Sequence, residues 1–263
     1  MIDLTEIVTH AEAPLVAPLR LALSEAIAAP IDRGRGIYTI DGMSGARYRH
    51  FVNGLMSHLG RLGRTGYLEV GSWMGSTLCS AIHGNAVRAV AIDNWSQFGG
   101  PRDAFLDNLA AFRTAEAAVE VIEADFRSVD FYELAARHAP FQVYLFDGPH
   151  EEQDQHDGLI AALPALTQDF VFICDDWNWW PVRAGTHRAI VQGGLQMLYG
   201  AEIRTTLDNS HPALASRKAT GTMATSLPCC ASRRARCRPG SPSPPDHGSR
   251  RLSRIPRSSG LRK

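Results

Sequence analysis

Two short segments, FDGPH and CDDWN, carry most of the residues that could do chemistry. Each segment closes an apolar run that is typical of a buried strand. Together they place Asp147, Asp175 and Asp176 at strand ends, with His150 three residues after the first of them. Side chains at the carboxyl ends of parallel strands point into the crevice where open α/β sheets bind ligands. We therefore expect a site for a metal ion and for proton transfer there.

The carboxylates favour a hard cation. Three neighbouring carboxylates raise one another's pKa values unless a cation compensates their charge, and all-oxygen ligation favours Mg²⁺ over zinc. Successive strand residues point to opposite faces, so the chain must leave the strand at Asp175 for Asp176 to reach the same ion. Three alternatives stay open: structural hydrogen bonding by Asp147, turn capping by Asp175, and an ordinary first-turn histidine at position 150. The tryptophans of CDDWNWW form either a substrate platform or loop packing.

The segment LEVGSWMGST predicts a strand, a tight turn and the start of a helix. Gly71 and Gly75 allow the backbone to approach a ligand closely. The pattern E-x-G-x-x-x-G differs from the G-x-G-x-x-G that cradles a pyrophosphate, so it suits a nucleoside ligand without phosphates.

Acidic residues end the next two predicted strands as well. Asp93, in AIDNW, could accept both hydroxyls of a ribose, and its distance from Gly71 is close to the spacing of dinucleotide folds. Asp125, in EADF, could accept from an adenine amino group, and Phe126 could pack on the base. The alternative is that both acids are solvated strand ends, but acids at successive strand ends favour a ligand.

The elements that must position these residues alternate along the chain. Expected strands are 67–70, 87–92, 119–123, 142–146 and 170–174, with a sixth at 202–207. Expected helices are 12–29, 46–62, 75–84, 102–115, 128–138, 151–166 and 186–199. The pattern predicts an α/β fold, a Rossmann-like doubly wound, mostly parallel sheet with helices on both faces. Residues 34–45 are expected to be a connector or a lid, and Arg47, Arg49 and His50 a solvated helix face.

Residues 42–190 resemble class I S-adenosylmethionine-dependent methyltransferases, and are similar to their metal-dependent, macrocin-type sugar O-methyltransferase branch. LEVGSWMGST, AIDNW, EADF, LFDGPH and CDDWN carry the resemblance, followed by Gly185-Thr186. The resemblance implies that Glu69, Gly71 and Ser72 line the methionine part of the cofactor, that Asp93 holds the ribose, and that Asp125 and Phe126 lie near the adenine. Their neighbours Gly75, Ser76 and Asn94 complete the predicted cofactor-binding set.

The same resemblance implies a reaction. Asp147, Asp175 and Asp176 match metal-ligating positions, and His150 matches a catalytic base. A metal ion lowers the pKa of an acceptor hydroxyl, and a histidine can take its proton. We expect Mg²⁺-assisted O-methylation of a small-molecule hydroxyl, such as that of a sugar or another natural product. The alternatives are a degenerate protein that only binds a nucleoside and a cephalosporin-hydroxylase-like enzyme.

Charge divides the chain into unequal parts. Residues 1–213 contain 15 Lys or Arg and 26 Asp or Glu, whereas residues 214–263 contain 12 and one. We expect a helical N-terminal extension over 1–62, the S-adenosylmethionine-binding domain over 63–212, and a disordered basic tail over 213–263. Nucleic-acid binding by that tail is the less favoured interpretation. A shifted reading frame would explain the abrupt change and the lack of a final antiparallel strand, and sequencing the source DNA would test it.

Location and partners follow from composition. The chain has no apolar run of membrane-spanning length and no basic segment followed by an apolar stretch at its start. We therefore expect a cytoplasmic protein without a membrane partner, and the oligomeric state stays open.

Overall fold

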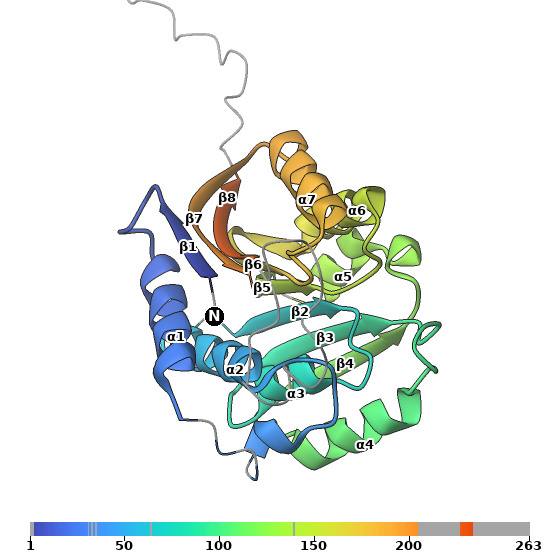
Figure 1. The fold of residues 1–263 in the computed structure, drawn as a ribbon. Helices are drawn as coiled ribbons and strands as arrows, with labels where there is room; N and C mark the ends of the chain where they lie inside the picture. Colours follow the sequence, from blue (N-terminus) through green and yellow to red (C-terminus); the bar gives the residue numbers. More distant parts are fainter. Residues whose placement is uncertain are drawn as a thin grey trace, which may run out of the picture.

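A single mixed sheet organises the chain. The computed structural model describes residues 3–30, 32, 34, 36–63, 65–138, 140–204 and 227–233. Their strands form one eight-stranded sheet in the order β1-β7-β8-β6-β5-β2-β3-β4 (Figure 1). The predicted doubly wound α/β fold is confirmed.

Five parallel strands form the part of the sheet that positions the site. They are β2 (Gly66–Val70), β3 (Arg88–Asp93), β4 (Ala118–Glu123), β5 (Phe141–Phe146) and β6 (Leu166–Cys174). Val70 pairs with Ile92 on one side and with Phe146 on the other, and Phe146 pairs with Cys174. The carboxyl ends of neighbouring strands are therefore level, so the residues that follow them meet at one edge.

Helices cover both faces of the sheet, as the apolar character of the strands requires. One core cluster joins the sheet to α1 (Val16–Ala28), α2 (Ala46–Gly60), α3 (Ser76–Ile82) and α4 (Arg102–Phe112). The other joins it to α5 (Phe131–Arg137), α6 (Glu152–Ala162) and α7 (Trp180–Gln192) (Figure 1). Short 3₁₀ helices lie at Gly36–Thr39 (η1), Phe126–Ser128 (η2) and Leu163–Ala165 (η3).

The N-terminal region belongs to the same body as the predicted domain. Strand β1 (Asp3–Val8), which sequence analysis did not predict, pairs antiparallel with β7 (Leu195–Arg204) at the sheet edge. Helices α1 and α2 share a core cluster with the sheet. Residues 1–62 therefore contain a strand as well as helices. Sequence analysis missed this strand because its pairing partner lies far away in the chain, as in the pair Asp3 and Arg204, and such pairing leaves no local signal.

The last helix and the last strand that the sequence predicted both begin earlier in the chain than expected. Helix α7 covers Trp180–Gln192 rather than 186–199, with Pro181 in its first turn, where proline suits a helix start. It ends at Gly193, and Gly194 has a φ of +60° that turns the chain away from the helix. Strand β7 therefore begins at Leu195, before the predicted 202–207.

Strand β8 (Leu227–Arg233) corrects two expectations about the tail. It lies between β6 and β7 and runs antiparallel to both, so the expected lack of a final antiparallel strand was wrong. Disorder was also wrong for this segment, because backbone pairing on both sides offsets the scarcity of apolar side chains. Ala231 is buried, and the Arg233 guanidinium donates to the carbonyls of Leu163 and Leu166. The rest of the predicted tail lies outside the described residues.

Within the described part of the chain, none of the helices combines the length and apolar character that crossing a membrane requires.

Candidate active site

A pocket of about 850 Å³ lies at the carboxyl ends of the parallel strands. Most of the predicted site residues line it: Gly71, Asp93, Asn94, Asp125, Phe126, Asp147, His150, Asp175 and Asp176. Four predicted cofactor residues do not line it: Glu69, Ser72, Gly75 and Ser76. The strand-end argument therefore located the pocket, whereas residues deeper in the first strand and turn have supporting positions.

Gly71 shapes the pocket where β2 ends. Its φ is +87°, and its amide donates to the carbonyl of Ile92 at 2.9 Å. A Cβ at this position would lie 1.9 Å from the carbonyl oxygen of Asp147. Glycine is therefore required by both the backbone conformation and the contact with the end of β5.

Glu69 supports this turn from inside the protein. Its side chain is fully buried, and the hydroxyl of Tyr67 donates to Oε2. Burial raises the pKa of Glu69 to about 7, although the hydrogen bond from Tyr67 opposes the shift. Ser72 is also buried, so neither side chain contacts the pocket directly.

Gly75 and Ser76 hold the start of α3. Gly75 has a φ of +78°, and a Cβ there would lie 2.8 Å from the ring of Phe105. The hydroxyl of Ser76 forms a hydrogen bond with that of Ser44 at 2.7 Å. These residues tie α3 to the N-terminal segment that forms another wall of the pocket.

One wall of the pocket is formed by Met43, Ser44 and Gly45. Arg49 of α2 holds this wall in place through hydrogen bonds. Arg49 is 5% exposed, and its guanidinium donates to the carbonyls of Ile37, Ile40, Gly42 and Ser44. The expectation of a solvated helix face was therefore wrong for Arg49. Helical periodicity failed there because this side chain bonds to a loop rather than to water.

Asp93 ties together the turns that follow β2 and β3. Its two carboxylate oxygens accept the backbone amides of Trp73 and Trp95, each at 2.7 Å. Both tryptophans have a left-handed backbone, with φ of 46° and 47°. Trp73 also lines the pocket with Ser96, Gln97 and Phe98, which sequence analysis missed because no motif marks them. The predicted ribose contact of Asp93 stays a prediction.

Arg127 covers the end of β4. Its guanidinium lies over the ring of Phe126, 4.6 Å from the centroid, and pairs with Asp125 and with Asp154 of α6. Phe126 is 4% exposed. Sequence analysis missed Arg127 and Asp154, and only the neighbouring positions of Phe126 and Arg127 could have drawn attention to this pair.

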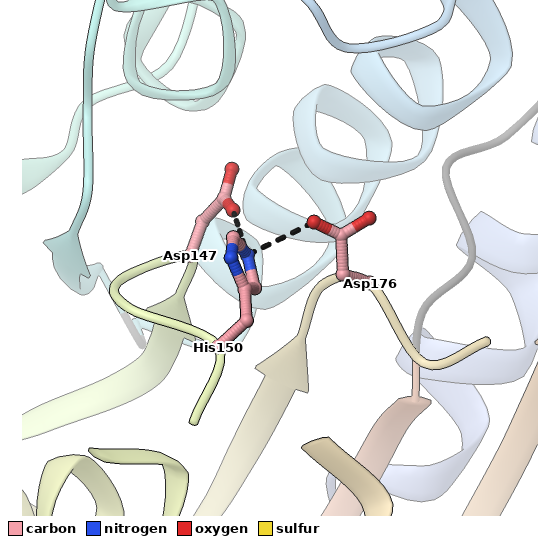
Figure 2. A group of neighbouring side chains, drawn as sticks. All are labelled: Asp147, His150 and Asp176. Atoms are coloured by element: carbon pink, nitrogen blue, oxygen red, sulfur yellow. Dashed lines mark ion pairs between the residues drawn. The ribbon is translucent and has the colours of Figure 1, made fainter. Parts of the chain in front are cut away.

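Asp147, His150 and Asp176 converge at the ends of β5 and β6 (Figure 2). His150 Nε2 lies 2.9 Å from Asp176 Oδ2 and 3.7 Å from Asp147 Oδ1. One ligand atom from each residue lies within 4.8 Å of the others. Asp176 has a φ of 50°, so the chain leaves the strand direction here. Burial by itself lowers the pKa of His150, but the two carboxylates raise it to about 10.

Asp175 does not belong to this convergent group. Its amide donates to the carbonyl of Phe146 at 3.2 Å, which continues the strand pairing by one residue. Its Oδ1 is buried and has no hydrogen-bond partner among the described residues. Burial and the charges of Asp147 and Asp176 raise the pKa of Asp175 well above its usual range. Its predicted role as a metal ligand stays a prediction.

The three tryptophans after Asp176 have different environments. Trp177 is fully buried in the core, and Trp180 is 66% exposed. Trp179 lines the pocket and packs edge to face against His150, with ring centroids 5.1 Å apart. Only Trp179 is therefore placed to contact a ligand next to His150.

Comparison with known proteins agrees with this fold. Residues 68–177 match a family described as a methyltransferase domain. No curated protein sequence matches the chain.

Three solved structures have a limited similarity to this chain. A provisionally named S-adenosylmethionine-dependent methyltransferase from Streptococcus mutans is 14% identical over 70% of this chain and 47% of its own, with a TM-score of 0.47. An O-methyltransferase from Bacillus cereus in complex with S-adenosylhomocysteine is 13% identical over 82% and 90%, with a TM-score of 0.48. The TDP-rhamnose 3′-O-methyltransferase of calicheamicin biosynthesis is 16% identical over 87% and 98%, with a TM-score of 0.41. Proteins described as RNA methyltransferases also match, so these similarities do not indicate a substrate.

The strand order and the pocket define a doubly wound α/β protein with a pocket at the carboxyl ends of its strands, where proteins of this class bind ligands. Within that class, residues 68–177 are similar to a family described as a methyltransferase domain.

Proposed function

We propose that the protein transfers a methyl group from S-adenosylmethionine to a hydroxyl of a small molecule, such as a sugar, with the help of Mg²⁺. The observation that carries the proposal is the convergence of Asp147, His150 and Asp176 in the pocket that Gly71 and Asp93 also line. Both halves of such a reaction, methyl donor and activated hydroxyl, would then meet in one cavity.

The pocket fits the cofactor. Its volume is within the range of pockets that hold small ligands, roughly 300–1,000 Å³. Gly71 keeps side-chain atoms away from the turn where we place the methionine part. Each carboxylate oxygen of Asp93 accepts one hydrogen bond from a backbone amide. Each oxygen can accept a second hydrogen bond, which a ribose hydroxyl would donate. When bound, S-adenosylmethionine supplies an electrophilic methyl group.

The convergent group also fits a hard cation. Carboxylate oxygens of Asp147 and Asp176 are ligands that Mg²⁺ prefers. Arg127 is the one arginine among the described residues that line the pocket, and it pairs with Asp125 and Asp154 instead. The buried and unpaired Oδ1 of Asp175 adds a further acceptor near this end of the pocket. A bound Mg²⁺ would lower the pKa of the acceptor hydroxyl.

His150 accepts the proton of that hydroxyl in this proposal. Without a cation, Asp147 and Asp176 hold the imidazole in its charged form, with a pKa of about 10, and an imidazolium cannot act as a base. Compensation of the two carboxylate charges removes the cause of that shift. The role of His150 as a base therefore depends on a cation bound at Asp147 and Asp176. Trp179 packs against the ring of His150 and orients it.

Calorimetric titration with S-adenosylhomocysteine, with and without Mg²⁺, tests this function. We expect the wild-type protein to bind both, and Asp147→Asn to bind S-adenosylhomocysteine but lose the Mg²⁺ signal. Asp107→Asn, an exposed change on α4 outside the pocket, is the matched control. Methyl transfer is then assayed on a panel of sugars and other hydroxyl compounds.

The outcomes separate the parts of the proposal. Absence of S-adenosylhomocysteine binding under every condition would contradict the methyltransferase function. If the wild-type protein binds S-adenosylhomocysteine but gives no heat of Mg²⁺ binding, the cation is removed from the proposal and the cofactor site is kept. Methyl transfer to nitrogen rather than oxygen acceptors would overturn the hydroxyl assignment.

A further inference from the structure

We propose that Arg127 is the platform on which the adenine of the cofactor stacks, an inference that rests on the proposed cofactor pocket. The sequence pattern had assigned this contact to Phe126. Arg127 is the single arginine among the described residues that line the pocket.

The position of the base follows from the sheet. Asp93, at the end of β3, pairs with Glu123 of β4, and the amide of Ala124 donates to the carbonyl of Asp93 at 3.0 Å. A nucleoside whose ribose lies at Asp93 therefore places its base over the residues that follow β4. Ala124, Asp125, Phe126 and Arg127 all line the pocket there.

Phe126 cannot offer an open ring face at this point. It is 4% exposed, and Phe146 packs against it edge to face, with ring centroids 5.3 Å apart. The guanidinium of Arg127 lies over the same ring. Both residues line the pocket, but Phe126 is buried and the guanidinium lies over its ring, so Arg127 offers the more exposed surface to a base.

Two carboxylates fix the guanidinium of Arg127. Nη1 donates to both oxygens of Asp125 at 3.1 Å, and Nη2 donates to Asp154. Hydrogen bonds to a guanidinium are made at its edge, within its plane. With its edge bonded and one face against Phe126, the opposite face of this 44% exposed side chain is the surface left for a base. Guanidinium planes stack well on flat π systems.

The positive charge of Arg127 is compensated by neighbouring carboxylates of the protein. Asp125 and Asp154 compensate it, so the side chain is poorly suited to attract a carboxylate or phosphate from a ligand. The contribution of Arg127 should therefore depend on planarity and contact more than on charge, and should change little with salt.

Calorimetry of S-adenosylhomocysteine binding tests the proposal through four variants. We expect Arg127→Ala to weaken binding about tenfold, a typical size for a stacking contact of this kind. Arg127→Lys, which keeps the charge but not the plane, should lose about as much, whereas Arg127→Gln, which keeps a planar group without charge, should lose less. Arg137→Ala is the control, because Arg137 also pairs with a carboxylate, that of Glu120, but lies outside the pocket. Thermal unfolding of each variant reports whether the fold is kept.

Two results would overturn the role of Arg127: unchanged affinity in Arg127→Ala, or a loss that disappears at high salt and is restored by lysine. The second result would mean that the charge acts, not the plane. Failure of the wild-type protein itself to bind S-adenosylhomocysteine would instead contradict the proposed function, so the two failures are distinguishable.

Discussion

Gly71 and Asp147 touch where the two halves of the pocket meet: a Cβ on residue 71 would lie 1.9 Å from the Asp147 carbonyl oxygen. Gly71 belongs to the turn that we assign to the cofactor, and Asp147 belongs to the convergent group that we assign to the cation. Because β2 and β5 are neighbours in the sheet, this backbone contact sets the spacing between those two parts of the site.

Gly71→Ala should therefore destabilise the protein by about 3 kcal/mol or more, since it combines a left-handed backbone with a clash against backbone atoms. Urea unfolding measures the change. Gly84→Ala is a matched control: its φ is +70°, but a Cβ there would have nothing within 4 Å. The control should lose only about 1 kcal/mol. Equal losses in the two variants would show that the contact with Asp147 has no cost.

The buried carboxyl of Glu69 should make stability depend on pH. Its pKa is about 7 in the folded protein and about 4.5 when unfolded, so the folded form retains a proton that the unfolded form loses. This contribution is complete below about pH 4.5 and is lost as the pH rises through about 7. Its full size is about 3 kcal/mol.

Glu69→Gln removes that titration. Relative to wild type, its free energy of unfolding should rise by about 3 kcal/mol between about pH 4.5 and 8, as measured by urea unfolding at each pH. Glu133→Gln, on an exposed side chain of α5, should show no such trend. Parallel pH profiles of Glu69→Gln and wild type would refute the raised pKa.

Binding of Mg²⁺ should release a proton near pH 8. His150 carries its proton there because Asp147 and Asp176 hold its pKa at about 10, and a cation that takes over these carboxylates removes that support. Calorimetry in two buffers of different ionisation enthalpy counts the protons released. Asp176→Asn suits the left-handed backbone at this position and should lose both the release and most of the affinity. Mg²⁺ binding with no proton release would argue against this site.

Arg49 should be needed for the wall formed by Met43, Ser44 and Gly45. Arg49→Met leaves several buried carbonyls without their donor, so we expect a loss of about 3 kcal/mol. Hydrogen exchange should become faster in residues 37–45. Arg61→Met, on an exposed side chain just after α2, is the control. Unchanged exchange in Arg49→Met would mean that the wall is held by other contacts.

Local pattern was enough to predict most of the sheet. The strands β2, β3, β5 and β6 are buried over most of their length, so each contains a nearly continuous apolar run that marks its position. Residues at or just after the ends of such runs lie at the pocket edge, which is why Asp93, Asp147 and Asp176 could be assigned to it. Asp125 was assigned in the same way from the end of the less buried β4. Strands β1 and β8 carried no such mark, since they depend on partners far away in the chain.

The amino-acid sequence by itself determined the fold class, the strand ends and the acidic character of the site, because burial and periodicity are local properties. Only the tertiary structure decided that His150 lies closer to Asp176 than to Asp147, that the convergent group is Asp147, His150 and Asp176, and that Arg127 covers Phe126. Each of these depends on backbone direction at a strand end and on contacts between separate elements. A left-handed residue at Asp176, or an ion pair between Arg127 and Asp154, follows from how the strands and helices pack together.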